Sequence, residues 1–474
     1  METAGQQRPL TKIVAGPRLK YLGLSVVLSW HYSLWFVPNT FPGASLFDNR
    51  VNYSWMSALI SSVVTVAVAA SIIGRNKHLP KSGWLIWGMA GLGSVGTLVI
   101  VLSTSLGTNM VPGYFGGGAV GTSAGMLWLL WGERYARQRA RFTLSRMAPT
   151  YGVTLIASLA CAYFLPLWAA PVFVAVLPLI SGWLLWLSWR RGPVMSNPPM
   201  LPRQVARHGF RSIVMVCSIA FAAALASYFT VAMVSTEDLW GAGRSYSLGV
   251  AIGAALILAM GLVQFLIRSA STVFRLFPWL VFGTIAATLL CVVRWSTDFV
   301  GFLLALAVVS VFEVLLIMYM ARSTLSGYTA AASAFALSCG AIRLGIWLGN
   351  ALAITYQGLA NPKDWTTPTL LMFAALLAGL LIPLVRQEYT INDLARSPQD
   401  ESDWTSILDQ VAQEYRLSTR EKQIVGMLGR GYTAAAVADK LVISPNTVNT
   451  HVQHIYDKLG IHKRSELLDY LNRR

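Results

Sequence analysis

The sequence predicts an all-α protein in which a polytopic bundle of twelve membrane helices precedes a small C-terminal domain of four helices. The 474 residues are 55% hydrophobic and only 12% charged. Apolar runs of about 18 to 22 residues, each long enough to cross a bilayer, recur along most of the chain. From about Tyr415 to Leu471 this character is lost, and short capped amphipathic helices are expected instead.

Twelve apolar runs make up the predicted membrane domain, residues 19–385, which follows a short N-terminal segment, residues 1–18. The fifth and sixth runs are separated only by a turn at Pro166, so the boundary between them is loosely defined. The longest internal loop, about 190–212, divides the domain into halves, 19–189 and 213–385. The runs lie near 19–37, 55–73, 84–103, 114–132, 150–166, 168–189, 213–234, 245–267, 276–294, 299–320, 329–350 and 366–385.

Basic side chains indicate which side of the membrane each loop faces. If the N-terminus is cytoplasmic, most Lys and Arg residues of the first 385 positions fall on the cytoplasmic side. The opposite side then holds only Arg50, Arg244, Arg294 and Lys363. This asymmetry, with an even number of spans, predicts a multi-pass protein of the cytoplasmic membrane with both termini in the cytoplasm.

The formal net charge of +17 belongs to the membrane part of the chain. Residues 386–474 hold equal numbers of basic and acidic side chains and contribute nothing to it. The excess is therefore a topology signal, and it indicates membrane lipid as a partner of the cytoplasmic loops.

Three helix starts are predicted in the C-terminal domain. Ser418 and Glu421 have the spacing of a capping box, and Thr433 can cap a second short helix. Ser444 followed by Pro445 is a favoured start for a third helix. A final helix follows, with Leu467, Leu468 and Leu471.

The third helix has one apolar and one polar face. Its inward residues are Val448, Val452, Ile455 and Leu459, and its outer residues are Asn446, Thr447, Asn449, Thr450, Gln453, His454 and Lys458. Two helices joined by a tight turn, the second with a polar outer face, form the geometry that enters the major groove of DNA.

This pattern closely resembles the LuxR-type (GerE-like) helix-turn-helix family. The matching residues are Leu417, Thr419, Arg420, Glu421, Gly431, Val437, Ala438, Leu441, Ile443, Ser444, Thr447, Val448, His451, Ile455, Lys458, Leu459, Gly460, Arg464 and Leu467. The resemblance implies a regulator that binds double-stranded DNA as a homodimer, with RNA polymerase as a further partner. It also implies base contacts from Asn449, Thr450 and Gln453 and phosphate contacts from Thr447, Lys440 and Lys458. His454 shares this surface.

Two departures from the family lower the expected affinity for phosphate. Asn449 stands where the family usually has Lys or Arg. Ala435, Ala436 and Val437 stand where it usually has Lys-Glu-Ile. Fewer basic side chains release fewer counterions, so the salt dependence of binding should be shallow.

The membrane part resembles the major facilitator superfamily in its division into six and six spans, which implies a central cavity between two halves. The segment Gly74, Arg75, Asn76 and Lys77 keeps the glycine and basic charge of that superfamily's loop pattern but lacks its acid. The missing acid indicates that the protein does not complete a transport cycle.

Charged residues inside the spans mark the candidate sensor site. Glu313 and Arg343 fall near mid-membrane in the tenth and eleventh spans, close enough for a long Arg side chain to reach the acid. They form either a structural ion pair or a ligand-binding or gating pair. His31, with Trp30, Tyr32 and Trp35, either lines an outer cavity or belongs to an interfacial aromatic belt.

The sequence predicts no enzyme activity, cofactor or metal site. No phosphate-binding loop, zinc-ligand cluster or nucleophile motif in context is present, and four scattered cysteines fit apolar filling. Residues 386–404 are polar and acidic and indicate a linker to the helix-turn-helix domain, 405–474.

These observations together predict a membrane-tethered transcriptional regulator that senses a small-molecule effector or a membrane state. One alternative is a major-facilitator-like transporter with an appended DNA-binding domain. Another is a membrane scaffold whose helical tail docks a protein.

Overall fold

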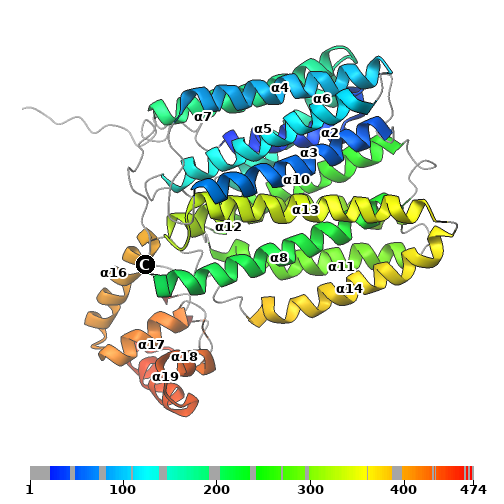
Figure 1. Ribbon diagram of the computed structural model, residues 1–474. Helices are drawn as coiled ribbons and strands as arrows, with labels where there is room; N and C mark the ends of the chain where they lie inside the picture. The colour runs from blue at the N-terminus through cyan, green and yellow to red at the C-terminus, as the bar shows by residue number, and fades with distance from the viewer. Residues whose placement is uncertain are drawn as a thin grey trace, which may run out of the picture. The chain divides into compact units, whose positions relative to one another are not determined.

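An α-helix occupies each of the twelve segments in which the sequence predicts a membrane span (Figure 1). The computed structural model describes residues 22–42, 49–73, 82–107, 110–137, 147–191, 203–234, 242–267, 271–293, 298–359, 361–386, 398–429, 432, 434–463, 466–467 and 470–471. The predicted N-terminal segment, 1–18, lies outside these described residues.

The helices of the first half are α2 (Gly23–Phe36), α3 (Asn49–Ile73), α4 (Gly83–Ser105), α5 (Met110–Ala136), α6 (Met147–Phe164) and α7 (Ala169–Arg191). Those of the second half are α8 (Arg203–Met233), α10 (Ala242–Ile267), α11 (Phe277–Val293), α12 (Asp298–Leu325), α13 (Ala331–Gln357) and α14 (Pro362–Arg386). Two short 3₁₀ helices, η2 (Pro38–Thr40) and η4 (Ser271–Leu276), stand between them. The break between α6 and α7 falls at Pro166, as predicted.

Ten helices of the described part are long and apolar enough to cross a membrane by length and composition. The other two predicted spans are α2, which has 14 described residues, and α5. α5 has 27 residues but is rich in glycine and ends with Glu133 and Arg134, which lowers its mean hydropathy. α8 starts ten positions before the predicted span, since its first residues are too polar for the bilayer core yet continue the helix.

The two halves repeat the same helix pairings. α3 packs on α5 as α10 packs on α12, and α2 packs on α6 as α8 packs on α13. Across the halves, α3 packs against α13 and α6 packs against α10. α12 is buried along nearly its whole length, so it forms a central element of the second half.

Small residues allow α3 and α5 to approach closely. Gly117 and Gly121 of α5 face the backbone of α3, and a Cβ at Gly121 would overlap the carbonyl oxygen of Ala58. Close backbone approach at small residues is a principal source of helix association in lipid, where apolar burial drives nothing.

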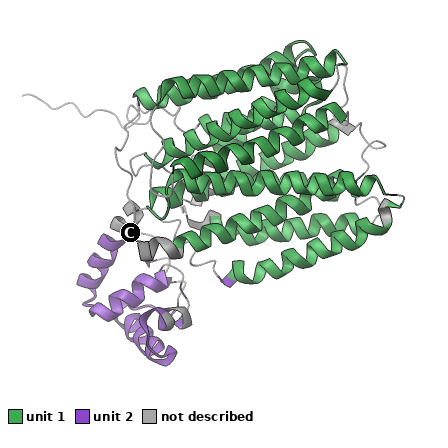
Figure 2. Cartoon of the chain, in the orientation of Figure 1, with its two compact units in different colours: residues 1–385 green, residues 386–474 purple. Residues whose placement is uncertain are grey.

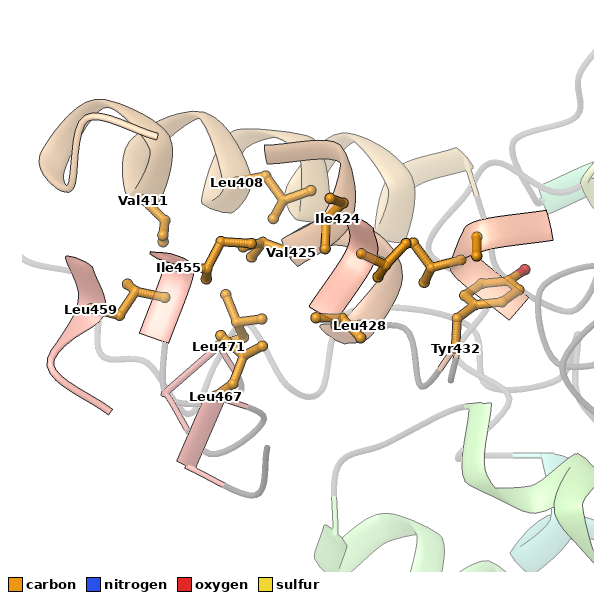
Figure 3. Packing of buried hydrophobic residues seen from close by; sticks show 13 residues of the cluster. Leu408, Val411, Ile424, Val425, Leu428, Tyr432, Ile455, Leu459, Leu467 and Leu471 are labelled. Atoms are coloured by element: carbon orange, nitrogen blue, oxygen red, sulfur yellow. The ribbon is translucent and has the colours of Figure 1, made fainter. Parts of the chain in front are cut away.

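Residues 386–474 form a second compact unit, described here by itself (Figure 2). Its helices are α16 (Pro398–Glu414), α17 (Thr419–Gly429), α18 (Ala434–Leu441) and α19 (Pro445–Leu459), and residues 466–467 and 470–471 are also helical. Ile424, Val425 and Ile455 form the centre of a core that Leu467 and Leu471 close from the C-terminal side (Figure 3). The all-α prediction is confirmed.

Helix α16 begins at Pro398, inside the segment 386–404 that was expected to be a linker. Residues 387–397 lie outside the described part. The reason for the extra helix is an apolar stripe in an otherwise polar segment. Leu408 and Val411 are buried in the core, and Trp404 packs against it, at spacings of three and four residues.

We expect Gly121→Ala to destabilise the membrane unit. The new Cβ must push α3 away from α5, which should cost about 1–3 kcal/mol. Thermal unfolding of the purified protein in detergent measures the effect. Gly118→Ala on the same helix is the control, because a Cβ there meets only the Ser57 hydroxyl at 3.9 Å. Equal melting temperatures for the two variants would contradict close packing at Gly121.

Candidate functional site

The capping box at the start of α17 forms as predicted. The backbone N–H of Glu421 donates to Ser418 Oγ at 3.2 Å, and the backbone N–H of Ser418 donates to Glu421 Oε2 at 2.7 Å. Two backbone donors at the helix start are thereby satisfied reciprocally.

Glu421 also binds Lys458, near the end of α19. Lys458 Nζ donates to Glu421 Oε1 at 3.0 Å and to Oε2 at 2.7 Å, and it lies 3.4 Å from the carbonyl oxygen of Arg416. Burial alone would raise the pKa of Glu421, but the hydrogen bonds from Lys458 and Ser418 outweigh it and lower that pKa to about 2. One carboxylate therefore ties the start of α17 to the end of α19.

Helix α19 is bounded by the residues that the sequence indicated. Ser444 Oγ accepts from the backbone N–H of Thr447 at 3.1 Å, with Pro445 in the first turn. Gly460 ends the helix with a φ of 66°, in the left-handed region that favours glycine, and its N–H donates to Tyr456. The expected cap of α18, Thr433, lies outside the described residues.

The turn between α18 and α19 is held from two sides. Arg420 Nη2 donates to the carbonyl oxygen of Leu441 at 3.0 Å, and the N–H of Ile443 donates to the carbonyl oxygen of Ala438 at 3.0 Å. Val442 has a φ of 54° and is 89% exposed. A β-branched residue is strained there, so tertiary contacts must hold the turn against local preference.

The outer face of α19 is open to solvent. Thr447, Asn449, Thr450, Gln453 and His454 are exposed, whereas Val448, Ile455 and Leu459 are buried beneath them. Asn449 and Gln453 stand one helical turn apart on this face. Both carry the amide that pairs with the major-groove edge of adenine.

The two lysines expected to contact phosphate both have protein partners. Lys440 Nζ donates to Tyr432 Oη at 2.7 Å and lies 4.2 Å from the centre of that ring. Lys458 is held by Glu421. Sequence reasoning did not find these contacts, because both partners lie outside the helix that carries the lysine.

In the membrane unit, the structure brings Glu313 and Arg343 together. Arg343 Nη2 on α13 donates to Glu313 Oε1 on α12 at 3.2 Å, and their side chains are only 7% and 3% exposed. Tyr32 Oη on α2 donates to Glu313 Oε2 at 2.8 Å. Both carboxylate oxygens are thus satisfied, one from each half of the bundle.

His31 lies next to this cluster on α2 and is 4% exposed. Its ring is T-shaped to that of Trp30 at 5.1 Å. Within the described part of the chain, His31 Nδ1 has no hydrogen-bond partner. Arg343 also lies 5.9 Å above the ring of Trp128 on α5.

Comparison with known proteins accounts for the C-terminal unit. Residues 415–471 match the family described as bacterial regulatory proteins, luxR family. This segment is a LuxR-type helix-turn-helix domain. Fimbriae Z protein of Escherichia coli (strain K12) is 46% identical over 54 residues, which cover 11% of this chain and 26% of that protein. The oxygen regulatory protein NreC of Staphylococcus aureus (strain JH9) is 41% identical over 54 residues, covering 11% of this chain and 25% of that protein.

The chain thus spans about a quarter of the length of these curated relatives, all of it in the helix-turn-helix domain. The remainder of each relative has no counterpart in the match. The comparison thus places a LuxR-type helix-turn-helix domain at residues 415–471.

The membrane unit has transporters as structural neighbours. A bacterial homologue of the iron transporter ferroportin, in an outward-facing state, aligns with a TM-score of 0.52 and 12% identity over 77% of this chain and 98% of that one. FucP, a major facilitator superfamily transporter, aligns with a TM-score of 0.47 and 11% identity over 78% of this chain and 97% of that one. The protein is therefore a multi-pass membrane protein with a transporter-like fold.

We expect Glu421→Gln to lower the free energy of unfolding of fragment 398–474 by about 1–2 kcal/mol at pH 7, since it weakens a cap and an ion pair together. The pKa of Glu421 is depressed, so its contribution is present above the ordinary value of 4.5 and is lost as pH falls toward about 2. Chemical denaturation from pH 7 to pH 2.5 should show the two proteins converging. Asp457→Asn, at an exposed position of α19, is the control. A constant gap at every pH would contradict the assignment.

We expect Glu313→Gln and Arg343→Gln each to destabilise the membrane unit by about 3–5 kcal/mol, because each leaves a buried partner unmatched. The double variant should lose less than the sum of the two. A double-mutant cycle on thermal unfolding in detergent measures the coupling. Additive losses would mean that the two residues act independently.

Proposed function

We propose that this protein is a membrane-tethered transcriptional regulator whose membrane unit controls DNA binding by its helix-turn-helix domain. The observation that carries the proposal is the exposed polar face of α19, within a LuxR-type domain, on the same chain as a transporter-like membrane unit. The bias of basic residues toward one set of loops supports cytoplasmic termini, which place the domain where DNA is.

In this proposal, α19 enters the major groove. Asn449, Thr450 and Gln453 contact base edges, and Thr447 contacts phosphate beside them. His454 lies at the rim of the same surface.

Lys440 and Lys458 contribute charge near the phosphates while staying anchored to Tyr432 and Glu421. Because Glu421 already compensates Lys458, one domain gains little from counterion release. Useful affinity then requires a homodimer on paired half-sites about one helical turn apart. Contact with RNA polymerase would follow from that position on DNA.

The membrane unit is the proposed sensor. Glu313 and Arg343 join α12 to α13, and Tyr32 extends the cluster to α2 in the other half. Because the cluster contains residues of both halves, its hydrogen bonds would change if the halves moved relative to each other. His31 lies beside the cluster. We propose that a small-molecule effector, or a change in membrane state, shifts this arrangement.

Transport with an appended regulatory domain is the second candidate, and the fold shared with a solved transporter favours it. Uptake of a labelled effector into proteoliposomes separates the two functions. A sensor binds without moving the label across the bilayer, whereas a transporter accumulates it.

Selection from a randomised duplex pool by fragment 398–474 tests the DNA-binding half of the proposal. The expected result is an enriched motif with an approximate two-fold axis, because a homodimer reads paired half-sites. A pool that stays random after repeated selection would remove the main support for regulation and favour the protein-docking alternative.

We expect Asn449→Ala to relax base preference at one position of that motif, at a cost of about 1–3 kcal/mol. Competition binding with single-base variants of the motif measures it. Gln413→Ala, at an exposed position of α16, is the control. An equal loss of affinity for all DNA sequences would mean that Asn449 contacts phosphate and that α19 is rotated in the groove.

We expect Tyr32→Phe to alter reporter transcription without lowering protein abundance. The change removes one hydrogen bond to Glu313 and leaves the ion pair and the ring packing in place. Reporter output is read beside membrane protein abundance in the same cells. Tyr163→Phe on α6, a half-buried tyrosine, is the control. Unchanged output in Tyr32→Phe would count against a gating role for the cluster.

A further inference from the structure

A cavity of about 270 Å³ opens between the two halves of the membrane unit, at the C-terminal end of α2. Both halves contribute to its wall. The residues used below are Trp35 and Phe36 of α2, Asn52 and Trp55 of α3, Tyr246 of α10 and Asn350 of α13. His31 is not among the residues that line it.

The wall combines aromatic faces with side-chain amides. Phe36 stacks on Tyr246 with ring centres 5.8 Å apart, and it meets Trp55 edge-on at 6.0 Å. Asn350 Nδ2 donates to Asn52 Oδ1 at 3.0 Å, which joins α13 to α3 across the halves. Every described lining residue is uncharged.

One polar group in this wall lacks a partner. The indole of Trp35 is 5% exposed, and its Nε1 finds no hydrogen-bond acceptor among the described residues. This N–H is itself buried and not open to the cavity, so the groups that an occupant can meet are the ring faces and the amides.

We propose that this cavity binds a neutral small molecule with a planar ring and hydroxyl or amide groups. A charged ligand would be desolvated against a wall whose described residues offer no opposite charge, whereas amides match neutral hydrogen-bonding groups. A planar ring suits the faces of Phe36, Trp55 and Tyr246. A volume of about 270 Å³ is sufficient for a molecule with a single ring.

The same residues connect the cavity to the buried ion pair. Phe36 lies 5.7 Å from the ring of Tyr32, whose hydroxyl binds Glu313. Trp55 lies 5.6 Å from the ring of Tyr228 on α8. An occupant therefore contacts Phe36, which packs against Tyr32, whose hydroxyl binds Glu313. Its polar groups also compete for the hydrogen bond between Asn350 and Asn52, which joins the two halves. This inference rests on the proposed sensing function for its biological meaning.

Three probes with one ring and one hydroxyl group test the charge preference. They are 4-hydroxybenzamide (neutral), 4-hydroxybenzoate (anionic) and 4-hydroxybenzylamine (cationic). Each is titrated at pH 7 against the full chain in lipid nanodiscs, with tryptophan fluorescence and melting temperature as readouts. The expected result is a dissociation constant for the neutral probe at least tenfold lower than for either charged probe.

Two substitutions locate the site. Asn350→Leu should raise the dissociation constant of the neutral probe at least tenfold, because it removes the amide and its hydrogen bond to Asn52. Asn350→Asp introduces a carboxylate and should move the preference to the cationic probe. Thr355→Val is the control, since Thr355 is exposed on the same helix and does not line the cavity.

Absence of binding by the neutral probe, equal binding of all three probes, or binding unaffected by either Asn350 variant would overturn the proposal. These measurements need neither DNA nor transcription. If the probe binds as expected but reporter transcription never responds to it, the site stands and the regulatory function fails. If the fragment selects DNA but no probe binds, the function stands and the site fails.

Discussion

The carboxylate of Glu313 is stabilised in the interior of the membrane unit by two donors. Arg343 satisfies one oxygen and Tyr32 the other, and together they connect α12, α13 and α2. A buried charge without such partners is costly, so the arrangement of these helices seen here is stabilised by both contacts. These contacts join helices of both halves of the bundle. The same bundle contains the close approach of α3 and α5, the buried helix α12 and the cavity beside Phe36.

The C-terminal unit also has a carboxylate that receives several hydrogen bonds, but this one lies in a water-soluble fold. There a carboxylate is cheap to expose, and Glu421 is instead placed where it performs two tasks at once. It caps α17 and receives Lys458 from α19, while Arg420 holds the turn at Leu441. The core of Ile424, Val425 and Ile455 supplies the apolar burial. The polar groups then join the start of α17 to the end of α19 and hold the turn that precedes α19.

Local sequence signals predicted what depends on neighbours along the chain. The capping box at Ser418, the end of α19 at Gly460 and the turn at Pro166 follow from residues within a few positions of one another. The pairing of Glu313 with Arg343 was also foreseeable, because each charge inside a span needs a partner. The contact from Tyr32 was not, since it joins residues 281 positions apart and depends on how the halves pack. The start of helix α16 was predicted to be a linker because the segment is acidic and polar. Its apolar residues Trp404, Leu408 and Val411 nevertheless lie on one face of a helix.

In the membrane-tethered regulator that we propose, the anchoring of Lys440 and Lys458 has a further consequence. The inner surface of a membrane is itself a polyanion, and a freely basic tail would adsorb to it. Residues 386–474 carry no net charge, and these two lysines are engaged by Tyr432 and Glu421. Lipid headgroups therefore gain little by binding the tail. In that proposal, anionic lipid and DNA are both available to the domain, and only DNA offers a base sequence for the exposed face of α19 to read.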